Sequence, residues 1–396
     1  MLVRIARKVG RELEYRRLKA EASRLPSPPY EPDRVRKILV PLYAGIGNIV
    51  LYGPALRAIR RRFPGAEIIA AVGTNRRNEE VLGPDIINRV IDVPLGAPAD
   101  RQRNDHQRLR DERFDLVVNA FHVAMAEQAA FTAAAGIPWR CGHVSSPGWS
   151  NLYDFLYTLP ARMERDEHEI DRYLHLARAV GATDEHIDPG LFFTIAPDAR
   201  AAADRLLLGL GVAPGSALVA VHAGTSEVMR WKQWGVERFE EVVRELAAAD
   251  PTLTFALVGA PDERDEQLPT ISRLSDALGA RFVDLVGATD VPQLAAVLER
   301  SRCLVGNDSG PMQIAVALGV PVVVPWGPSD LPRNRPRDPR HTVLFQNLPC
   351  SPCYRMPGDS YVHLCNDHLC LSTISVDAVV VATRATLDRS PATTSA

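Results

Sequence analysis

The chain has 396 residues, of which 46% are hydrophobic and 24% are charged, and its formal net charge is −2. This length suits two domains of ordinary size, and the near-neutral charge argues against a nucleic-acid-binding protein. No apolar run of about eighteen residues occurs, so no membrane span is expected, and charged residues interrupt the start where a secretory signal would be apolar. We therefore expect a cytoplasmic protein.

Residues 1–33 are predicted to form a basic amphipathic helix followed by a proline-rich linker. Leu2, Ile5 and Val9 recur at helical spacing among eight basic residues, and Pro26 begins the linker. Two interpretations stay open. The helix is either a peripheral anchor on the anionic inner leaflet of a membrane, or it packs on the protein's own surface.

A first α/β domain is expected over residues 34–190. Short apolar runs alternate there with helical stretches, a pattern typical of a parallel, doubly wound sheet. The predicted strands cover residues 38–42, 66–72, 89–93, 114–119 and 138–142. Helices are predicted over residues 49–63 and, near the end of this domain, 169–180.

The loop after the first predicted strand contains Gly45, Gly47 and Asn48. It lacks the third glycine of the dinucleotide-binding fingerprint, so a nicotinamide cofactor is not indicated. Asn48 is a neutral amide that can position a hydroxyl group but cannot act as a general base. His122 follows the strand predicted at residues 114–119 and would lie at the same edge of the sheet, which makes it a candidate base, with a structural role as the alternative.

A second α/β domain is expected over residues 191–390. Its predicted strands cover residues 217–222, 252–258, 281–287, 303–305 and 320–324. Its predicted helices cover residues 198–210, 236–249, 292–300 and 311–318. The same alternation of strands and helices again predicts a parallel sheet.

Residues 306–312 join a predicted strand to a predicted helix in this second domain. Asp308 or Ser309 can cap the helix, and Pro311 suits its first turn. The N-terminus of such a helix has unpaired N–H groups and the positive end of the helix dipole, and it lies at the C-terminal edge of a parallel sheet. Such a place suits a pyrophosphate, although an ordinary strand-to-helix turn is the alternative.

The stretch Gly-Asn-Asp-Ser-Gly-Pro-Met at residues 306–312 resembles the signature of glycosyltransferase family 9, the heptosyltransferase-like enzymes of bacterial surface polysaccharide. Two other blocks resemble the family: the Gly-x-Gly loop at residues 45–48, and His-x-Gly-x-Ser at residues 222–226 followed by Lys-x-Trp. The resemblance covers roughly residues 36–385. It implies the GT-B fold, with two Rossmann-like domains facing each other across a cleft.

The resemblance implies an inverting transfer of heptose or a related sugar from a nucleotide-sugar donor to a hydroxyl of a glycan or lipid-linked acceptor. No cofactor would be required for catalysis. The acceptor would bind the first domain and the donor the second, with Lys232, one of only four lysines, stabilising the departing pyrophosphate. An exposed lysine packed on the neighbouring tryptophan is the alternative. The residues implied to bind substrate are Gly45, Gly47, His222, Gly224, Thr225, Ser226, Lys232, Asn307, Asp308, Ser309, Gly310, Pro311 and Met312.

Two positions depart from the family pattern. Asn48 stands where the family commonly has the aspartate assigned as the base, and Gln313 stands where it usually has histidine. Neither replacement can carry the charge of the usual residue. These departures keep open a degenerate protein that binds a nucleotide sugar without turnover. A sugar-nucleotide epimerase on the same fold is a further alternative.

Four of the six cysteines lie close together, at Cys350, Cys353, Cys365 and Cys370. Their spacing resembles that of a structural zinc site, and free thiols or a disulfide are the alternatives. In a reducing cytoplasm a metal is favoured over a disulfide. We expect this segment, residues 350–370, to support a loop beside the site and to take no part in catalysis.

Overall fold

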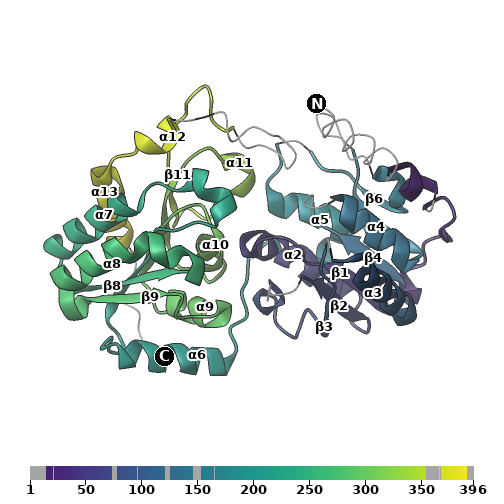
Figure 1. The fold of residues 1–396 in the computed structure, drawn as a ribbon, viewed down its shortest axis with the longest axis horizontal. Coiled ribbons are helices and arrows are strands. Elements are labelled where there is room, and N and C mark those ends of the chain that lie inside the picture. The colour runs from purple at the N-terminus through teal and green to yellow at the C-terminus, as the bar shows by residue number, and fades with distance from the viewer. Residues whose placement is uncertain are drawn as a thin grey trace. The chain divides into compact units, whose positions relative to one another are not determined.

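The structure is a computed structural model that describes residues 15–20, 22–73, 78–95, 97–120, 125–145, 153–164, 166–353, 365 and 367–389. The chain divides into two compact units, Met1–Gly190 and Leu191–Ala396, which we call unit 1 and unit 2. Each unit has a central sheet with helices on both of its faces (Figure 1).

The described part of unit 1 contains a six-stranded parallel sheet in the order β3-β2-β1-β4-β5-β6. The strands are β1 Lys37–Pro41, β2 Glu67–Val72, β3 Arg89–Asp92, β4 Leu116–Asn119, β5 Trp139–His143 and β6 Leu159–Ala161. The chain first moves outward from β1 to β3 and then returns to β4 on the other side of β1. This reversal creates a topological switch point between the carboxyl ends of β1 and β4.

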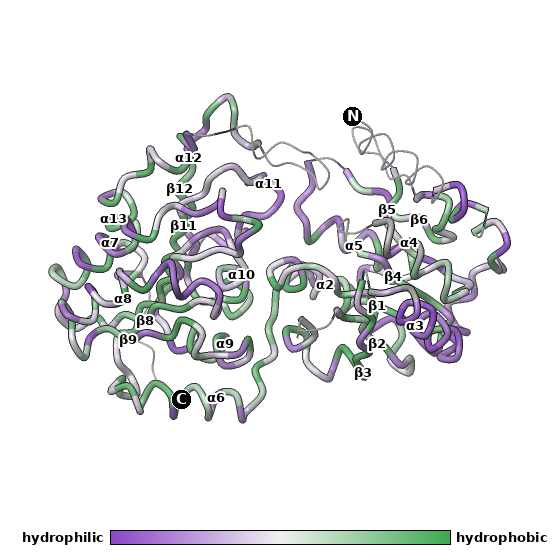
Figure 2. Tube along the Cα trace, in the orientation of Figure 1, coloured by the Kyte–Doolittle hydropathy of each residue, from purple (hydrophilic) through white to green (hydrophobic). Residues whose placement is uncertain are grey.

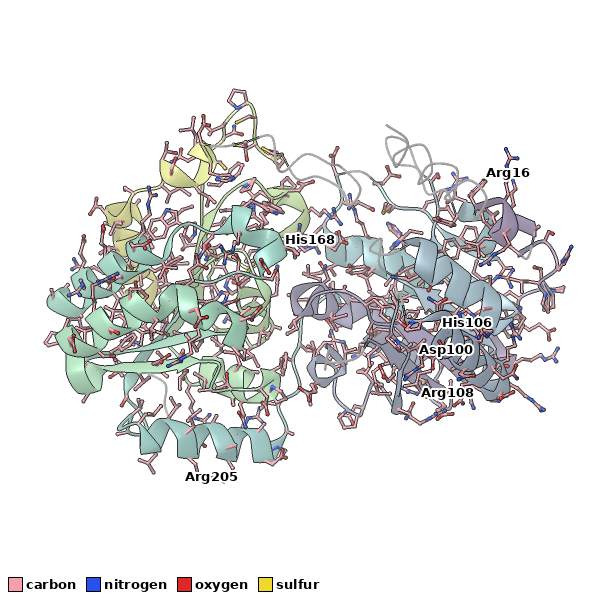
Figure 3. All side chains as sticks on the ribbon, viewed as in Figure 1. Arg16, Asp100, His106, Arg108, His168 and Arg205 are labelled. Carbon is pink, nitrogen blue, oxygen red and sulfur yellow. The ribbon has the colours of Figure 1, made fainter. Side chains whose placement is uncertain are left out.

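Four helices flank this sheet, with α2 against α5 and α3 against α4 (Figure 1). The described helices of unit 1 that follow the N-terminal segment are η1 Pro32–Arg34, α2 Ile46–Arg62, η2 Asn78–Val81, α3 Ala99–Glu112, α4 Met125–Ala135, η3 Asp154–Leu156, α5 Glu169–Ala179 and η4 Asp184–His186. Leu39, Val117 and Phe131 belong to the apolar core beneath α3 and α4. Figure 2 shows hydrophobic central strands and a hydrophilic α3, which carries the charged side chains of Asp100 and Arg108 labelled in Figure 3.

The residues before the first strand also belong to unit 1. Residues 15–20 are helical, and Leu18 is fully buried in a cluster with Ala133 and Leu156. The ring of Tyr15 meets that of Phe155 edge-on, with 5.5 Å between centroids. This part of the predicted N-terminal helix therefore packs on the protein's own surface. The earlier apolar positions lie outside the described residues, so the membrane-anchor interpretation stays a prediction.

A buried arginine fastens the linker that follows this helix. Arg140, only 2% exposed, donates hydrogen bonds to the carbonyl oxygens of Pro26 (3.0 Å) and Leu156 (2.6 Å) and to Ser27 Oγ (3.3 Å). Because a buried guanidinium is costly unless its N–H groups are satisfied, these bonds fix the linker to the domain.

The described part of unit 2 repeats the topology of unit 1, with the order β12-β11-β10-β7-β8-β9. Its strands are β7 Ala217–His222, β8 Leu253–Gly259, β9 Phe282–Val286, β10 Cys303–Gly306, β11 Val322–Trp326 and β12 Thr342–Phe345. The neighbouring strands are parallel. The switch point of this unit therefore lies between the carboxyl ends of β7 and β10.

Helices cover both faces of the second sheet, with α6 and α10 against α9, and α8 and α13 against α7 (Figure 1). The helices are α6 Pro197–Gly209, η5 Glu227–Lys232, α7 Val236–Ala249, η6 Pro261–Glu263, α8 Arg264–Leu278, η7 Gly279–Arg281, α9 Val291–Glu299, α10 Gly310–Ala317, α11 Leu331–Asn334, α12 Leu369–Ser372 and α13 Val376–Arg389. Val221, Phe239 and Val379 belong to the core between the sheet and α7, α8 and α13.

The predicted α/β class with two parallel sheets is confirmed. The helix predicted over residues 49–63 begins earlier, at Ile46, so that most of the predicted loop forms the first turn of α2. Two edge strands, β6 and β12, were not predicted. None of the described helices combines the length and the apolar character that crossing a membrane requires.

Candidate functional site

The switch point of unit 2 brings together two motifs that lie about eighty residues apart in the sequence. Gly306 pairs with His222, so the loop after β10 lies beside the loop after β7. Crevices at such switch points are where open α/β sheets bind their ligands. We call this group of loops, residues 222–232 and 306–312, the unit 2 site.

Asn307 joins the two loops. Its side chain is fully buried, and Nδ2 donates to the carbonyl oxygens of Ala223 (2.8 Å) and Gly224 (3.1 Å). Its Oδ1 accepts a hydrogen bond from the backbone N–H of Trp234 at 3.0 Å. Both amide hydrogens are therefore used within the protein, and we expect Asn307 to hold the loops in place and not to contact a ligand directly.

Lys232 reaches into the same site. Its Nζ lies 2.7 Å from Asp308 Oδ2, and the two side chains are 17% and 7% exposed. The hydroxyl of Ser329 donates to the same carboxylate oxygen at 2.6 Å. The amine also lies 5.6 Å from the ring centroid of Trp231, so packing on that ring and pairing with Asp308 occur together. The ion pair fixes a cation at this edge of the sheet.

The residues that follow Asp308 in the motif form the N-cap and first turn of α10. Ser309, one of the two residues predicted to cap this helix, is the N-cap residue, but its hydroxyl does not cap the helix. The hydroxyl lies 2.9 Å from His222 Nδ1 and donates to the carbonyl oxygen of Asn307 at 3.1 Å. Gly310 and Pro311 follow, both partly exposed, so the beginning of the helix is open to a ligand.

A threonine hydroxyl in the loop after β7 has no hydrogen-bond partner in the described part of the chain. Thr225 is 8% exposed, and its Oγ1 makes no hydrogen bond within the described residues. A buried hydroxyl without a partner costs free energy, and a ligand oxygen is one group that could satisfy it. Ser226, the next residue, is exposed.

Glu263 is a residue of this site that the sequence reasoning missed. Its Oε2 lies 3.3 Å from His222 Nε2, and the residue is 9% exposed. A Cβ at Gly259 would lie 2.7 Å from this oxygen, and a Cβ at Gly224 would overlap it. Glu263 lies in η6, the short helix that follows β8, and β8 pairs with β7, which is the signal that could have revealed it.

Gln313 has a structural contact. The side chain is 4% exposed, and its Nε2 donates to the carbonyl oxygen of Asn334 at 3.0 Å. This bond ties α10 to α11. The position where the family usually has histidine is therefore occupied by a buried amide that donates a hydrogen bond to a backbone carbonyl oxygen.

The cysteine-rich segment supports the turn that carries Ser329. Ser351 Oγ donates a hydrogen bond to the carbonyl oxygen of Gly327 at 3.3 Å. The backbone N–H of Cys353 donates to the carbonyl oxygen of Pro328 at 3.0 Å. The expected support of a loop beside the site is therefore present, since the Ser329 hydroxyl binds the Asp308 carboxylate.

The four clustered cysteines are free thiols, and burial with the nearby thiols raises the pKa of Cys370 to about 11. Among the described residues, no group of three or more His, Cys, Asp and Glu is arranged to hold a metal ion. Residues 354–364, between Cys353 and Cys365, lie outside the described part of the chain. The zinc site stays a prediction from the spacing.

The switch point of unit 1 has fewer side-chain hydrogen bonds than that of unit 2 among the described residues. Gly45 is the N-cap residue of α2, and Asn48 lies in the first turn, half-buried, with no side-chain hydrogen bond to any described residue. Asn119, at the end of β4, is 4% exposed and donates to Thr132 Oγ1 at 3.1 Å, while its Oδ1 has no partner in the described part of the chain. His122 lies outside the described residues, so its proposed role as base stays a prediction.

A model of the family "Glycosyltransferase family 9 (heptosyltransferase)" matches residues 103–360. Lipopolysaccharide heptosyltransferase 2 of Escherichia coli K12 is 24% identical over 302 residues, which cover 74% of this chain and 83% of that protein. Lipopolysaccharide heptosyltransferase 1 of the same strain is 22% identical over 307 residues, with 74% and 88% covered.

Among solved structures, the family 9 glycosyltransferase of Veillonella parvula has a TM-score of 0.71 at 21% identity, covering 90% of this chain and 98% of that one. The ADP-heptose lipopolysaccharide heptosyltransferase II of E. coli has a TM-score of 0.70 at 20% identity, covering 89% and 99%. These similarities confirm the predicted GT-B fold class.

Proposed function

Because the chain belongs to glycosyltransferase family 9, we propose that this glycosyltransferase moves heptose or a related sugar from a nucleotide-sugar donor to a hydroxyl of a bacterial cell-surface glycan, with inversion at the transferred carbon. We propose further that residues 191–390 bind the donor and residues 34–190 bind the acceptor. The solved relative named for ADP-heptose makes ADP-heptose the first donor to test.

The observation that carries this proposal is the cation held at the start of α10. Lys232 is fixed 2.7 Å from Asp308, next to the N-terminus of a helix at the switch point. A diphosphate there would meet an ammonium group, the positive end of a helix dipole and the hydroxyl of Thr225, which has no partner among the described residues. These groups are preorganised, which is the condition for stabilising the charge that develops on a leaving group.

In the proposed reaction, the acceptor oxygen forms a bond to the anomeric carbon while the bond from that carbon to the diphosphate oxygen breaks. The electron pair of the broken bond remains on the nucleoside diphosphate, where Lys232 stabilises it. The acceptor hydroxyl loses its proton to a base, for which we propose His122. Asn48 orients the hydroxyl by hydrogen bonds because an amide cannot take the proton.

No cofactor or metal is needed for this scheme, since the charge on the departing diphosphate is met by protein groups. A lipid-linked acceptor would bring the protein to the inner membrane. Arg16, Arg17 and Lys19 are exposed on the helix whose apolar side is buried on unit 1, which supports attraction to an anionic membrane surface.

The test is sugar transfer from a panel of nucleotide sugars, including ADP-heptose, to lipopolysaccharide-core acceptors. Product analysis by NMR gives the configuration of the new bond, and inversion is expected. Transfer with retention would contradict the mechanism. Consumption of donor without acceptor, with a new sugar epimer as product, would indicate an epimerase.

A second candidate is a protein that binds a nucleotide sugar without turning it over, and Asn48 and Gln313 favour it. In that case calorimetry would detect donor binding, no acceptor extract would consume the donor, and Asn48→Asp would introduce transfer activity. Turnover by the unaltered protein with any acceptor would exclude this candidate.

A further inference from the structure

The side-chain amide of Gln313 has a fixed orientation at the beginning of α10. Gln313 is the fourth residue of this helix, and its Nε2 donates to the carbonyl oxygen of Asn334 at 3.0 Å. A carbonyl oxygen only accepts hydrogen bonds, so the amide nitrogen, and not the amide oxygen, lies on this side. The amide oxygen Oε1 is therefore turned away from Asn334.

This oxygen is an acceptor that the protein leaves unused. Gln313 is only 4% exposed, and Oε1 accepts no hydrogen bond from any residue that the structure describes. The atom is nevertheless not closed off from solvent, in contrast to the hydroxyl of Thr225. Because the rest of the side chain is buried and held by Asn334, the oxygen has a fixed position that a ligand can reach.

A second unused acceptor belongs to Asp308. Both contacts of this carboxylate, from Lys232 at 2.7 Å and from Ser329 at 2.6 Å, are made by Oδ2. Within the described ranges of the chain, Oδ1 accepts no hydrogen bond, and it is open to solvent although the residue is only 6% exposed. Asp308 is bound to Ser329 and Gln313 to Asn334, so both acceptors lie toward the segment that follows β11.

The kind of ligand follows from the charge of these two oxygens. A phosphate or carboxylate group would be repelled by them, whereas a hydroxyl group can donate a hydrogen bond to each. A nucleotide sugar has hydroxyl groups on the sugar that is attached to its diphosphate. Gln313 lies four residues after the N-cap residue Ser309, which is about 6 Å along the helix axis. A sugar attached to a diphosphate at the N-terminus of α10 is therefore near enough to meet Oε1.

We infer that Gln313 determines which sugar is transferred: Oε1 accepts a hydrogen bond from one hydroxyl of the sugar, beside Asp308 Oδ1, which accepts from another. This inference rests on the proposed function, because it requires the donor diphosphate at the start of α10. The bond from Nε2 to Asn334 keeps the amide from turning round and offering a hydrogen instead. The site therefore selects a neutral sugar with a hydroxyl at this point, and it disfavours a sugar that has a carboxylate there or lacks this hydroxyl.

Calorimetry with ADP and with ADP-heptose separates a contact with the sugar from a contact with the nucleotide. Gln313→Met nearly keeps the volume and removes both polar atoms of the amide. It is expected to weaken ADP-heptose binding by roughly fivefold to tenfold, the loss of about one hydrogen bond, and to change ADP affinity by less than about twofold. Equal losses for the two ligands would overturn the inference, because they would show that Gln313 acts only through the bond that ties α10 to α11.

Deoxy analogues of the donor identify the hydroxyl that Gln313 binds. ADP-heptose analogues that each lack one sugar hydroxyl are compared in the unaltered protein and in Gln313→Met. One analogue is expected to bind the unaltered protein more weakly by about the factor that the substitution costs, and to bind the two proteins equally well. If the loss from every missing hydroxyl adds to the loss from the substitution, the inference is overturned.

Gln313→His is a second variant that keeps an acceptor. A neutral imidazole can donate to the carbonyl oxygen of Asn334 from one nitrogen and accept at the other. It is expected to bind ADP-heptose within about threefold of the unaltered protein, and a loss as large as that of Gln313→Met would overturn the inference. Gln107→Met is the matched control, because Gln107 is exposed on α3 of unit 1, and it is expected to change neither affinity.

The same measurements separate this inference from the proposed function. If ADP-heptose binds more tightly than ADP and Gln313→Met leaves that difference unchanged, only the inference fails. If another nucleotide sugar, and not ADP-heptose, binds more tightly than its own nucleotide, the proposed heptose donor fails and the comparison with that sugar tests Gln313. If no nucleotide sugar binds more tightly than its nucleotide, both fail.

Discussion

The two switch points share one topology and differ in chemistry. In unit 2, Asn307, Asp308 and Ser309 each bind a partner within the unit through their side chains. In unit 1, Asn48 has no side-chain partner among the described residues, and Asn119 Oδ1 has none either. Among the described residues, the same strand order therefore supports a charged site in one half and an uncharged one with fewer side-chain hydrogen bonds in the other.

This difference suits the two proposed substrates. A diphosphate carries charge that must be stabilised by groups already in place, because reorganising dipoles during the reaction would cost free energy. An acceptor hydroxyl is neutral until it reacts, and it needs orientation more than charge. Substitutions in the two units should therefore affect different substrates.

Lys232→Ala should reduce the rate of sugar transfer by about a hundredfold or more, as removal of a preorganised electrostatic group commonly does. The measurement is kcat with saturating donor, with thermal unfolding as a check that the variant folds. Arg230→Ala is the control, since Arg230 lies in the same 3₁₀ helix with its side chain 61% exposed. Equal losses in the two variants would mean that general surface charge, and not the fixed cation, drives the reaction.

His143, at the carboxyl end of β5 in unit 1, should make stability sensitive to acid. Burial lowers its pKa to about 4, while the unfolded chain has a value near 6.5. The unfolded state therefore binds the proton first, and stability is lost as the pH falls from about 6.5 toward 4, by up to roughly 3 kcal/mol.

Urea unfolding at pH 7 and pH 4.5 measures this loss. His143→Gln cannot take the proton, so its stability should change less between the two pH values than that of the unaltered protein. An equal change in both proteins would assign the acid sensitivity to other groups.

Asn48→Ala should lower kcat/KM for the acceptor by roughly tenfold, because one orienting hydrogen bond is lost, and should leave ADP affinity unchanged. Initial rates at varied acceptor, with calorimetry for ADP, give the two quantities. If ADP affinity falls as much as acceptor kcat/KM, the assignment of separate substrates to the two units is wrong.

Ser329→Ala should have the smallest effect, a weakening of ADP binding by a few-fold. It removes one of the two contacts to Asp308 Oδ2 and leaves Lys232 in place, which costs about 1 kcal/mol. The control is Ser272→Ala on the exposed side of α8. An unchanged affinity would show that the ion pair alone positions the lysine.

The central strands could be predicted because each is a continuous apolar run, and β7 and α7 have the predicted bounds. The edge strands β6 and β12 could not, because they are short and only partly buried, and β6 contains Pro160. The early start of α2 was also missed, because Gly45 and Gly47 have low helix propensity and only the tertiary structure places them at a helix N-terminus.

Within the site, motif residues near one another in sequence were predicted together. Glu263 was not, because it meets His222 only through the strand order that places β8 beside β7. The sequence allowed Ser309 to cap α10, but its hydroxyl contacts His222 Nδ1 instead. This contact could not be predicted for the same reason, because His222 belongs to a different loop. Contacts across a sheet edge depend on topology, which short motifs do not encode.

The bonds from Arg140 to the linker also decide how the protein can be shortened for crystallisation. A truncated protein that began at β1 would lose the carbonyl oxygen of Pro26 and the hydroxyl of Ser27, and the buried guanidinium would keep its charge without them. It would also uncover the apolar surface that Leu18 occupies. A well-behaved recombinant fragment of unit 1 therefore has to retain the chain from Tyr15 onward, even though the sheet starts more than twenty residues later.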